Sequence, residues 1–264
     1  MRVRSRRLVL RSFVGLVLAL ALVTSLATGG AAAKTSKSNI NGITVFAAAS
    51  LTDVLPAIDS GPTYSFGSSG TLATQINNGA PADVFLAAAT TQPAQLFAAG
   101  KLSKPVNFTR NKLVIVVPKN NPAGITSIYD LTKPGTKIVV AGPTVPVGSY
   151  TLQVLKQMNL TAKVTPNFVS QETDVRAVLT KVQTGQGDAG FVYSTDAQTV
   201  PNDVKVIKVP AWAQPKVVYA MGYVLSSPNQ AKDKAYMAEI MSKKGQATLQ
   251  KYGFLPLASS SGAK

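Results

Sequence analysis

The residues of this chain that could do chemistry are mostly hydroxyls at points where a strand-like run gives way to a helix-like pattern. Ser50 lies in FAAASLTDV, and Ser69 lies in FGSSGTLA. Further turns of this kind span residues 143–149, 173–175 and 193–196. A helix start presents unpaired N–H groups at the positive end of the helix dipole, so each turn could bind an anion without a charged side chain. Any one of these hydroxyls could also be an ordinary helix N-cap.

The same serines invite an enzymatic interpretation, which the composition disfavours. A nucleophile at Ser50 or Ser69 would need a general base, yet the chain contains no histidine. Neither segment has the G-x-S-x-G spacing of a nucleophile elbow, and no G-x-x-x-x-G-K-[ST] phosphate loop occurs. The chain has no cysteine, and no acidic cluster shows metal-ligand spacing. We therefore expect no catalytic residues and no cofactor, and a hydrolase or transferase built on these serines is the weaker alternative.

The chain is basic, but the distribution of its charge does not favour a nucleic-acid partner. Its 264 residues include 27 Lys and Arg against 11 Asp and Glu, a formal net charge of +16. Five arginines lie in the first 33 residues, so the remainder carries 22 basic residues against 11 acidic ones. The lysines of this remainder are mostly scattered singly, a pattern typical of a solvated surface. A basic surface also suits long-range attraction of a small anion.

The N-terminus has the pattern of an export signal. Residues 1–33 combine an arginine-rich start, an apolar run over residues 13–26 and a final AAA cleavage pattern. The apolar run is shorter than the ~20 residues that a membrane-spanning helix needs. We expect a signal peptide over 1–33, a disordered lead-in over 34–41 and, without a cysteine for a lipid anchor, a periplasmic or secreted protein. The pair Arg6-Arg7 leaves twin-arginine export open beside the general route.

Strand-like runs alternate with helix-like segments along the rest of the chain, which is the pattern of βαβ units and a mostly parallel sheet. The two longest strand-like runs, Leu113–Val117 and Val217–Leu225, bracket a complete α/β segment. The simplest arrangement has two α/β lobes, the second inserted into the first, with the long strands as crossings and a ligand cleft between the lobes. We expect lobe I at residues 42–113 and 218–257, lobe II at 114–217, and a flexible tail at 258–264.

Some individual elements follow from the same patterning. It predicts a helix over Leu51–Ile58, a strand over Val164–Val169 and one long helix over Lys232–Tyr252. The S-x-x-D spacing of Ser50 and Asp53 is a relative of the helix capping box. Such a box would make Ser50 a cap rather than a ligand.

Several segments, taken in order, resemble the periplasmic molybdate-binding proteins of ABC importers. They run from about Ile43 to about Pro256 and read ITVFAAASLTDV, FGSSGTLATQINNGAPADVFLAA, VPVGSY, ETDVRAVLTKVQTGQGDAGFVYSTDA and KYGF. The resemblance implies a type II periplasmic-binding-protein fold, in which each lobe is a mixed, mostly parallel sheet flanked by helices. It also implies a monomer that captures molybdate or tungstate and delivers it to the membrane permease of an ABC importer.

The resemblance further implies which residues hold the oxyanion. The family's hydroxyl ligands fall on Ser50 and Ser69, its tyrosine ligand falls on Tyr193, and its backbone N–H donors fall on Val147 and Val175. Molybdenum or tungsten would be held only as the oxyanion, through these residues. The five positions coincide with the five turns described above.

The choice of ligand stays open at the level of sequence. A site made only of donors rejects a protonated ligand, because the O–H group of that ligand would lack an acceptor. Hydrogen phosphate carries such a proton at neutral pH, whereas molybdate, tungstate and sulfate do not, and a sulfate or phosphate receptor is the alternative. Asp53 and Asp174 could supply an acceptor or simply favour their helix starts. Arg176 could attract the anion or form an ion pair.

Overall fold

The computed structural model describes residues 40–257, which belong to one compact unit. The expected signal peptide over residues 1–33 and the expected tail over 258–264 lie outside the described residues, as does the lead-in before residue 40. Within 40–257, no helix is both long enough and apolar enough to cross a membrane.

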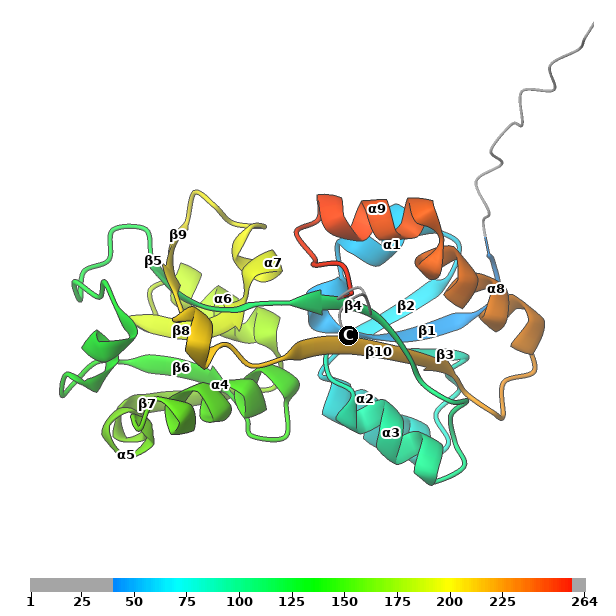
Figure 1. Ribbon diagram of the computed structural model, residues 1–264, viewed down its shortest axis with the longest axis horizontal. Coiled ribbons are helices and arrows are strands. Elements are labelled where there is room, and N and C mark those ends of the chain that lie inside the picture. The colour runs from blue at the N-terminus through cyan, green and yellow to red at the C-terminus, as the bar shows by residue number, and fades with distance from the viewer. Residues whose placement is uncertain (1–39, 258–264) are drawn as a thin grey trace, which may run out of the picture. The chain divides into compact units, whose positions relative to one another are not determined.

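Two five-stranded mixed sheets form the framework of the described chain (Figure 1). The first sheet has the order β2-β1-β3-β10-β4 and comprises β1 (Thr44–Ala48), β2 (Thr63–Gly67), β3 (Val84–Ala87), β4 (Val106–Asn111) and β10 (Val217–Tyr223). The second sheet has the order β7-β6-β8-β5-β9 and comprises β5 (Leu113–Pro118), β6 (Ile138–Ala141), β7 (Phe168–Glu172), β8 (Ala189–Tyr193) and β9 (Val204–Lys208). In each sheet one strand, β10 or β5, runs antiparallel to the others. The predicted α/β class with mixed, mostly parallel sheets is confirmed.

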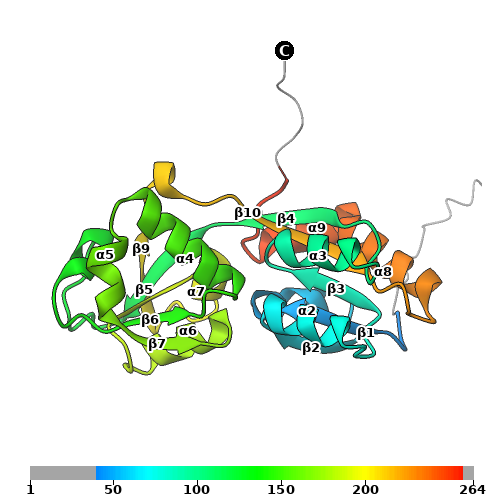
Figure 2. The ribbon, with the colours of Figure 1, turned by 90° about the horizontal axis from the view of Figure 1, so that it is seen from below.

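Helices cover both faces of each sheet (Figures 1 and 2). We call the elements on the first sheet the first lobe; its helices are α1 (Val54–Ile58), α2 (Ser69–Asn77), α3 (Thr91–Ala98), α8 (Gln230–Met241) and α9 (Lys243–Lys251). The second lobe, on the second sheet, carries α4 (Pro146–Gln157), α5 (Thr161–Val164), α6 (Val175–Gln183) and α7 (Ser194–Ala197). Short 3-10 helices are η1 (Ala49–Leu51), η2 (Ile128–Thr132), η3 (Thr165–Asn167) and η4 (Ala211–Ala213).

The packing of α6 shows why the sequence folds this way locally. The helix buries four apolar residues at the i, i+3, i+4, i+7 spacing of a single helical face: Val175, Val178, Leu179 and Val182. This face packs on β8, β6 and β5. A Cβ at Gly190 of β8 would lie 2.8 Å from Val178 Cγ1, so a glycine is needed for the helix to approach the strand this closely.

The carboxyl ends of neighbouring parallel strands meet at one edge of each sheet. In the first sheet, Ala48 at the end of β1 pairs with Gly67 at the end of β2. In the second sheet, Ala141 at the end of β6 pairs with Glu172 at the end of β7. The segments that follow these strands therefore begin side by side, at the edge where open α/β sheets bind ligands.

The chain passes between the two sheets twice, each time next to one of the long apolar runs. Lys112 alone separates β4 from β5, and residues 209–216 join β9 to β10 (Figure 1). We expected these long runs themselves to cross between the lobes, and this expectation is wrong. Each run belongs to one sheet, β5 to the second and β10 to the first. The sequence interpretation missed β4, because most residues of its sequence VNFTRN are polar. β4 is an edge strand of the first sheet, and some of its residues are exposed to solvent.

The strand expected over Val164–Val169 is wrong in its bounds. The strand is β7 at Phe168–Glu172, and residues 161–167 form the short helical turns α5 and η3 instead. Pro166 within the expected range has no N–H group to donate to a sheet, which favours a turn there.

The single helix expected over Lys232–Tyr252 is also wrong, since α8 and α9 are separate helices. Ser242 between them has an extended backbone conformation, and its hydroxyl accepts a hydrogen bond from the N–H of Gly245 at 3.0 Å. A serine N-cap therefore ends one helix and starts the next. The expected helix over Leu51–Ile58 likewise starts late, because α1 begins only at Val54.

A buried cluster of two carboxyl groups and one hydroxyl ties the segment after β10 to the first sheet. Ser227 Oγ lies 2.6 Å from both Asp83 Oδ1 and Asp233 Oδ2, and Asp233 is fully buried. Ser227 has a single proton to donate, so one of these two contacts must be a donation from a protonated carboxyl group. Burial and the charge of Asp83 raise the pKa of Asp233, although its hydrogen bond with Ser227 acts in the opposite direction. Asp233 is therefore the protonated partner.

We expect Asp233→Asn to be tolerated, because the amide NH₂ group can donate to Ser227 Oγ as the carboxylic acid does. A folded-state pKa above the unfolded value of about 3.9 means that folding takes up a proton. This contribution to stability is full below about pH 4 and is lost as the pH rises through the folded-state pKa. The difference in free energy of unfolding, Asp233→Asn minus wild type, should therefore become more positive as the pH rises from 4 to 8, and urea unfolding measures it.

Asp83→Asn is the matched control. Both oxygens of Asp83 accept hydrogen bonds, from the N–H of Thr44, the hydroxyl of Ser227 and the side-chain amide of Asn229. An amide NH₂ group would face one of these donors, so this variant should lose stability at every pH. The same pH profile for both variants would contradict the assignment of the proton to Asp233.

Candidate functional site

The segments at the carboxyl edges of the two sheets enclose a small cavity. Its walls come from the ends of β1, β2 and β3 in the first lobe, and from the starts of α4 and α6 and the end of β8 in the second. The centre of a water molecule could occupy about 10 Å³ inside it, which is roughly the room that one water molecule needs. All five residues singled out in the sequence line this cavity: Ser50, Ser69, Val147, Val175 and Tyr193.

Ser69 presents a hydroxyl whose proton is free for the cavity. It is the first residue of α2 and is 1% exposed, and its Oγ accepts a hydrogen bond from the N–H of Ala88 at 3.0 Å. Ser68 is the N-cap of this helix, with the N–H of Thr71 at 3.5 Å from its Oγ. Because Ser69 accepts from Ala88 and caps nothing, it can donate its proton to a ligand.

Ser50 lies within η1, and the capping-box interpretation of Ser50 and Asp53 is wrong. Ser50 Oγ lies 2.8 Å from the hydroxyl of Tyr219, a residue of β10, and makes no cap. The carboxylate of Asp53 makes no cap either and binds Arg176. Ser50 is 3% exposed and lines the cavity, and its one side-chain hydrogen bond among residues 40–257 is with Tyr219.

Val175 offers a backbone N–H group at the start of α6. The carboxylate of Asp174, the N-cap, accepts from the N–H groups of Arg176 and Ala177 at 2.8 and 3.0 Å. It does not accept from Val175, and the first N–H groups of a helix have no acceptor within the helix. The N–H of Val175 is therefore available to a ligand.

Val147 offers the equivalent group at the start of α4. Pro146 occupies the first position of this helix, where its missing N–H costs nothing. Gly148 allows the first turn to press against the end of β6, because a Cβ there would lie 2.2 Å from the carbonyl oxygen of Gly142. The N–H of Val147 thus has no acceptor within the helix and stands at the cavity wall.

Tyr193 contributes a buried donor without an acceptor. Its side chain is 1% exposed, and Oη has no hydrogen-bond partner among the described residues. Burial raises the pKa of Tyr193 well above its usual value, so the group is a neutral O–H. The ring is held edge-on by Tyr219 and Tyr150, at centroid distances of 5.9 and 6.5 Å. An unpaired buried donor costs about 1–3 kcal/mol, so the cavity holds a group that needs an acceptor.

The charged residues around the cavity are paired with one another. No lysine or arginine is among the described residues that line it. Arg176 Nε lies 2.8 Å from Asp196 Oδ1, and Nη2 lies 2.5 Å from Asp53 Oδ2, which joins the two lobes. Burial opposes ionisation of Arg176, but the two carboxylates raise its pKa. Burial raises the pKa of Asp196 to about 6, against the effect of Arg176. Arg176 is therefore an ion-pair residue. Asp53 and Asp174 were the two acids that could supply an acceptor to the ligand, and of these only Asp174 lines the cavity.

This arrangement suits anion binding better than covalent catalysis. The hydrogen-bond partners of Ser50 and Ser69 are the hydroxyl of Tyr219 and the N–H of Ala88, and neither group is a base. Two hydroxyls, two backbone N–H groups and a tyrosine O–H instead face one small space. These groups can hold an ion that accepts hydrogen bonds on all sides.

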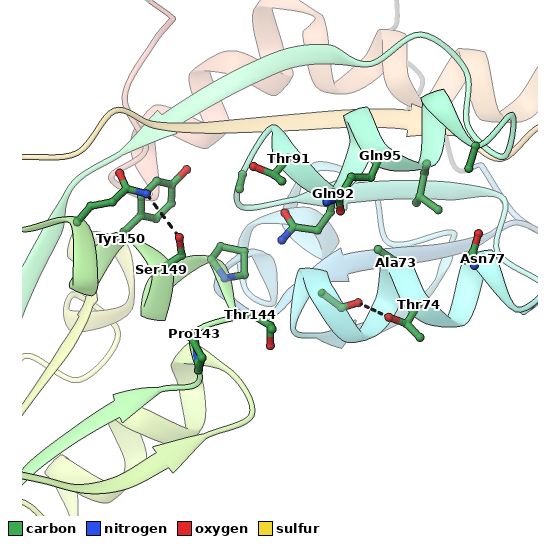
Figure 3. A pocket seen from close by; sticks show the side chains of 16 residues that line it. Ala73, Thr74, Asn77, Thr91, Gln92, Gln95, Pro143, Thr144, Ser149 and Tyr150 are labelled. Carbon is green, nitrogen blue, oxygen red and sulfur yellow. Dashed lines mark hydrogen bonds between the residues drawn. The ribbon is translucent and has the colours of Figure 1, made fainter. Parts of the chain in front are cut away.

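A larger groove of about 620 Å³ lies next to the cavity and differs from it in character (Figure 3). Its walls are α2 and α3 of the first lobe and the start of α4, and Pro146 borders both spaces. None of its lining residues is charged. The side-chain oxygen of Gln92, which has no partner among the described residues, is a buried acceptor here. The groove thus has uncharged walls and an amide group of Gln92 that can accept a hydrogen bond from a ligand.

Two residues behind Ser50 were missed from the sequence. Tyr219 contacts Ser50 across 169 residues of chain, and Asn111 contacts Tyr219 across 108 residues. A contact of this range leaves no local pattern. The available signal was position: Asn111 directly precedes the crossing into the second lobe, and Tyr219 lies in a long strand-like run that borders the other crossing.

Comparison with known proteins relates the chain to a family of binding proteins. Residues 62–255 match the family model described as bacterial extracellular solute-binding protein. Molybdate-binding protein ModA of Mycobacterium tuberculosis is 37% identical over 222 residues, which cover 80% of this chain and 84% of that protein. ModA of Haemophilus influenzae is 32% identical over 229 residues, 80% and 89% of the two chains. These relatives are named as binding proteins, not as enzymes.

Solved structures show the same fold. The substrate-binding domain of a putative molybdenum ABC transporter from Clostridium difficile is 29% identical, with a TM-score of 0.61, over 82% of this chain and 99% of that one. The periplasmic molybdate-binding protein of Azotobacter vinelandii, at 22% identity, superposes with a TM-score of 0.74 over 82% of this chain and all of that one. The sulfate-binding protein SubI of Mycobacterium tuberculosis, at 20% identity, reaches 0.69 over 83% and 88%. The family match and the relatives above 30% identity show that the chain belongs to the bacterial extracellular solute-binding proteins.

Proposed function

We propose that this protein captures molybdate or tungstate outside the cytoplasm and delivers it to the membrane permease of an ABC importer. The observation that carries the proposal is the hydroxyl of Tyr193, a fully buried donor without a partner among the described residues, in a small cavity that the other four proposed ligands also line. The proposed ligands of the oxyanion are Ser50, Ser69, Val147, Val175 and Tyr193. The relatives from Mycobacterium tuberculosis and Haemophilus influenzae are molybdate-binding proteins by name, which supports the choice of molybdate.

The chemistry of the donors explains which anions fit. An anion buried without a counter-charge is stabilised by hydrogen bonds to its charged form, which are stronger than neutral ones. The five proposed donors offer no acceptor to a protonated ligand, which disfavours hydrogen phosphate. Sulfate is also fully deprotonated at neutral pH and is the second candidate, since only the size of the cavity would separate it from molybdate. Asp174 is the carboxylate at the cavity wall, and both of its backbone hydrogen bonds use Oδ1. The rejection of hydrogen phosphate therefore depends on Oδ2 of Asp174 facing away from the ion.

Capture would depend on closure, because the donors come from both lobes. Ser50 and Ser69 belong to the first lobe, and the other three proposed ligands belong to the second. Such a receptor works as a monomer that closes on the ion and opens at the permease. Export would use the signal over residues 1–33, with cleavage after the signal leaving a periplasmic or secreted protein.

Calorimetric titration with molybdate, tungstate, sulfate and phosphate tests the proposed function. We expect sub-micromolar dissociation constants for molybdate and tungstate, much weaker binding of sulfate, and weaker binding still of phosphate at neutral pH. Failure of both molybdate and tungstate to bind below micromolar concentration would refute the proposal. Tight binding of sulfate alone would keep the receptor and change its ligand.

Tyr193→Phe should separate binding from folding. The hydroxyl has no partner among the described residues of the protein, so its removal should leave the melting temperature of the free protein unchanged or slightly higher. Affinity for molybdate should fall by about 1.5–3 kcal/mol, the value of a hydrogen bond to a charged group. Thermal unfolding with and without molybdate measures both quantities.

Ser69→Ala is the comparison for this variant. Its hydroxyl also accepts from the N–H of Ala88, so the alanine should weaken both molybdate binding and the free protein. If Tyr193→Phe keeps full affinity, the buried hydroxyl is not a ligand. If Ser69→Ala keeps full affinity, Ser68, which also lines the cavity, becomes the candidate.

Gly70→Ala tests the dependence on closure. A Cβ at Gly70 in α2 would lie 2.9 Å from the carbonyl oxygen of Thr144 in the second lobe, which is closer than real Cβ contacts allow. We expect weaker molybdate binding with an unchanged melting temperature of the free protein, because only the closed arrangement is strained. Gly142→Ala is the matched control, since its Cβ would have its nearest neighbour at 3.8 Å. Equal affinities of the two variants would contradict the role assigned to this contact.

A further inference from the structure

We propose that Asn111 and Tyr219 are positioning residues that make Ser50 an obligatory hydrogen-bond donor to the bound anion. The inference rests on the proposed function, since it concerns how one donor of that site is oriented. Neither residue lines the cavity, so both would act through Ser50.

The first step is the orientation of the Asn111 amide. Its Oδ1 accepts from the backbone N–H of Lys112 at 2.8 Å and from the hydroxyl of Ser194 at 3.0 Å. A backbone N–H can only donate, so a flipped amide would place two donors against each other. The NH₂ group must therefore point the other way, where Thr195 Oγ1 lies at 2.9 Å and Tyr219 Oη at 3.3 Å.

The second step is the direction of the Tyr219 hydroxyl. Tyr219 is fully buried, and burial raises its pKa well above the usual value, so the phenol keeps its proton. Its Oη accepts a hydrogen bond from the NH₂ group of Asn111 and has Ser50 Oγ at 2.8 Å as its other partner. The NH₂ group of Asn111 cannot accept, so the phenolic proton points to Ser50.

The third step concerns Ser50 itself. Its Oγ accepts from Tyr219, so its own proton must point away from Tyr219. Ser50 is buried and lines the cavity, which leaves the cavity as the direction for that proton. The order of donation is Asn111 to Tyr219, Tyr219 to Ser50, and Ser50 to the anion. The proton of Ser50 therefore points into the cavity before the ion arrives.

The chain of hydrogen bonds also joins the two lobes. Asn111 ends β4 of the first lobe, yet two of its four hydrogen bonds go to Ser194 and Thr195 at the start of α7 in the second lobe. The bond from the N–H of Lys112 and the contacts with Tyr219 and Ser50 lie at or within the first lobe, so the orientation of Ser50 does not require the bonds to α7.

A double-mutant cycle on Tyr219 and Ser50 tests the proposal by titration with molybdate. Tyr219→Phe leaves Ser50 free to rotate, and we expect about a tenfold loss of affinity, the scale of one hydrogen bond. In the Ser50→Ala background the same change should have almost no effect, because no hydroxyl remains to be oriented. Equal losses in both backgrounds would overturn the proposal and assign Tyr219 a merely structural role.

Tyr236→Phe is the matched control for the loss of a buried phenol in the same lobe. Tyr236 is fully buried, its hydroxyl bonds to the hydroxyl of Tyr64, and it does not line the cavity. We expect its molybdate affinity to equal that of the wild type. A loss equal to that of Tyr219→Phe would show that any buried phenol matters and would contradict a specific role.

Asn111→Asp gives a readout that a structural role would not produce. A carboxylate accepts from Tyr219, which lets Tyr219 accept from Ser50 and turns the proton of Ser50 away from the ion. At pH 8 molybdate and hydrogen phosphate are both dianions, so the added charge affects both alike and cancels in the ratio of their affinities. We expect the preference for molybdate to fall about tenfold or more, by the scale of one hydrogen bond. An unchanged ratio overturns the proposal, whereas a wild type that binds no oxyanion refutes the proposed function itself.

Discussion

The hydroxyl of Tyr193 is buried and lacks a hydrogen-bond partner among the described residues. The surrounding structure holds this donor at the wall of a small cavity, where a ligand could accept from it. A buried donor without a partner costs about 1–3 kcal/mol, and a ligand that accepts its hydrogen bond removes that cost from the closed arrangement. The rings of Tyr150 and Tyr219 hold it in place, and the parallel strands β6 and β8 bring it level with the starts of α4 and α6. The closed cavity therefore favours a ligand that can accept a hydrogen bond.

No lysine or arginine of the described residues lines the cavity, although the chain as a whole is basic. Arg176 near the cavity is paired with Asp53 and Asp196. Surface lysines can attract an anion over a distance, but a fixed cation in the site would hold any anion, protonated or not. Neutral donors make the interaction depend on the number and direction of hydrogen bonds. This favours selection by protonation state and size over selection by charge.

The patterning of the sequence predicted the α/β class and marked five turns at helix starts. The resemblance to the molybdate-binding proteins then named one residue in each turn, and all five of these residues line the cavity. The patterning failed where position depends on distant residues. β4 was missed because its residues are mostly polar, as an edge strand allows. The spacing of Ser50 and Asp53 resembles a capping box, but Ser50 binds Tyr219 and Asp53 binds Arg176, both far along the chain. Asn111 and Tyr219 have no motif, since their roles arise from the crossing of the chain between two sheets.

Release poses the opposite physical problem to capture, and the distribution of donors addresses both. A full charge in the cavity wall would have to be separated from a dianion on opening, which costs much in a low-dielectric site. Here the donors are neutral and divided between lobes, so separation of the lobes removes the contributions of Val147, Val175 and Tyr193 from an ion left on Ser50 and Ser69. The bonds from Asn111 to Tyr219 and from Tyr219 to Ser50 lie within the first lobe, so Ser50 would stay oriented toward the ion as the lobes part. In this proposal, opening removes three of the five donors at once, which would let a tight site release its ligand unchanged.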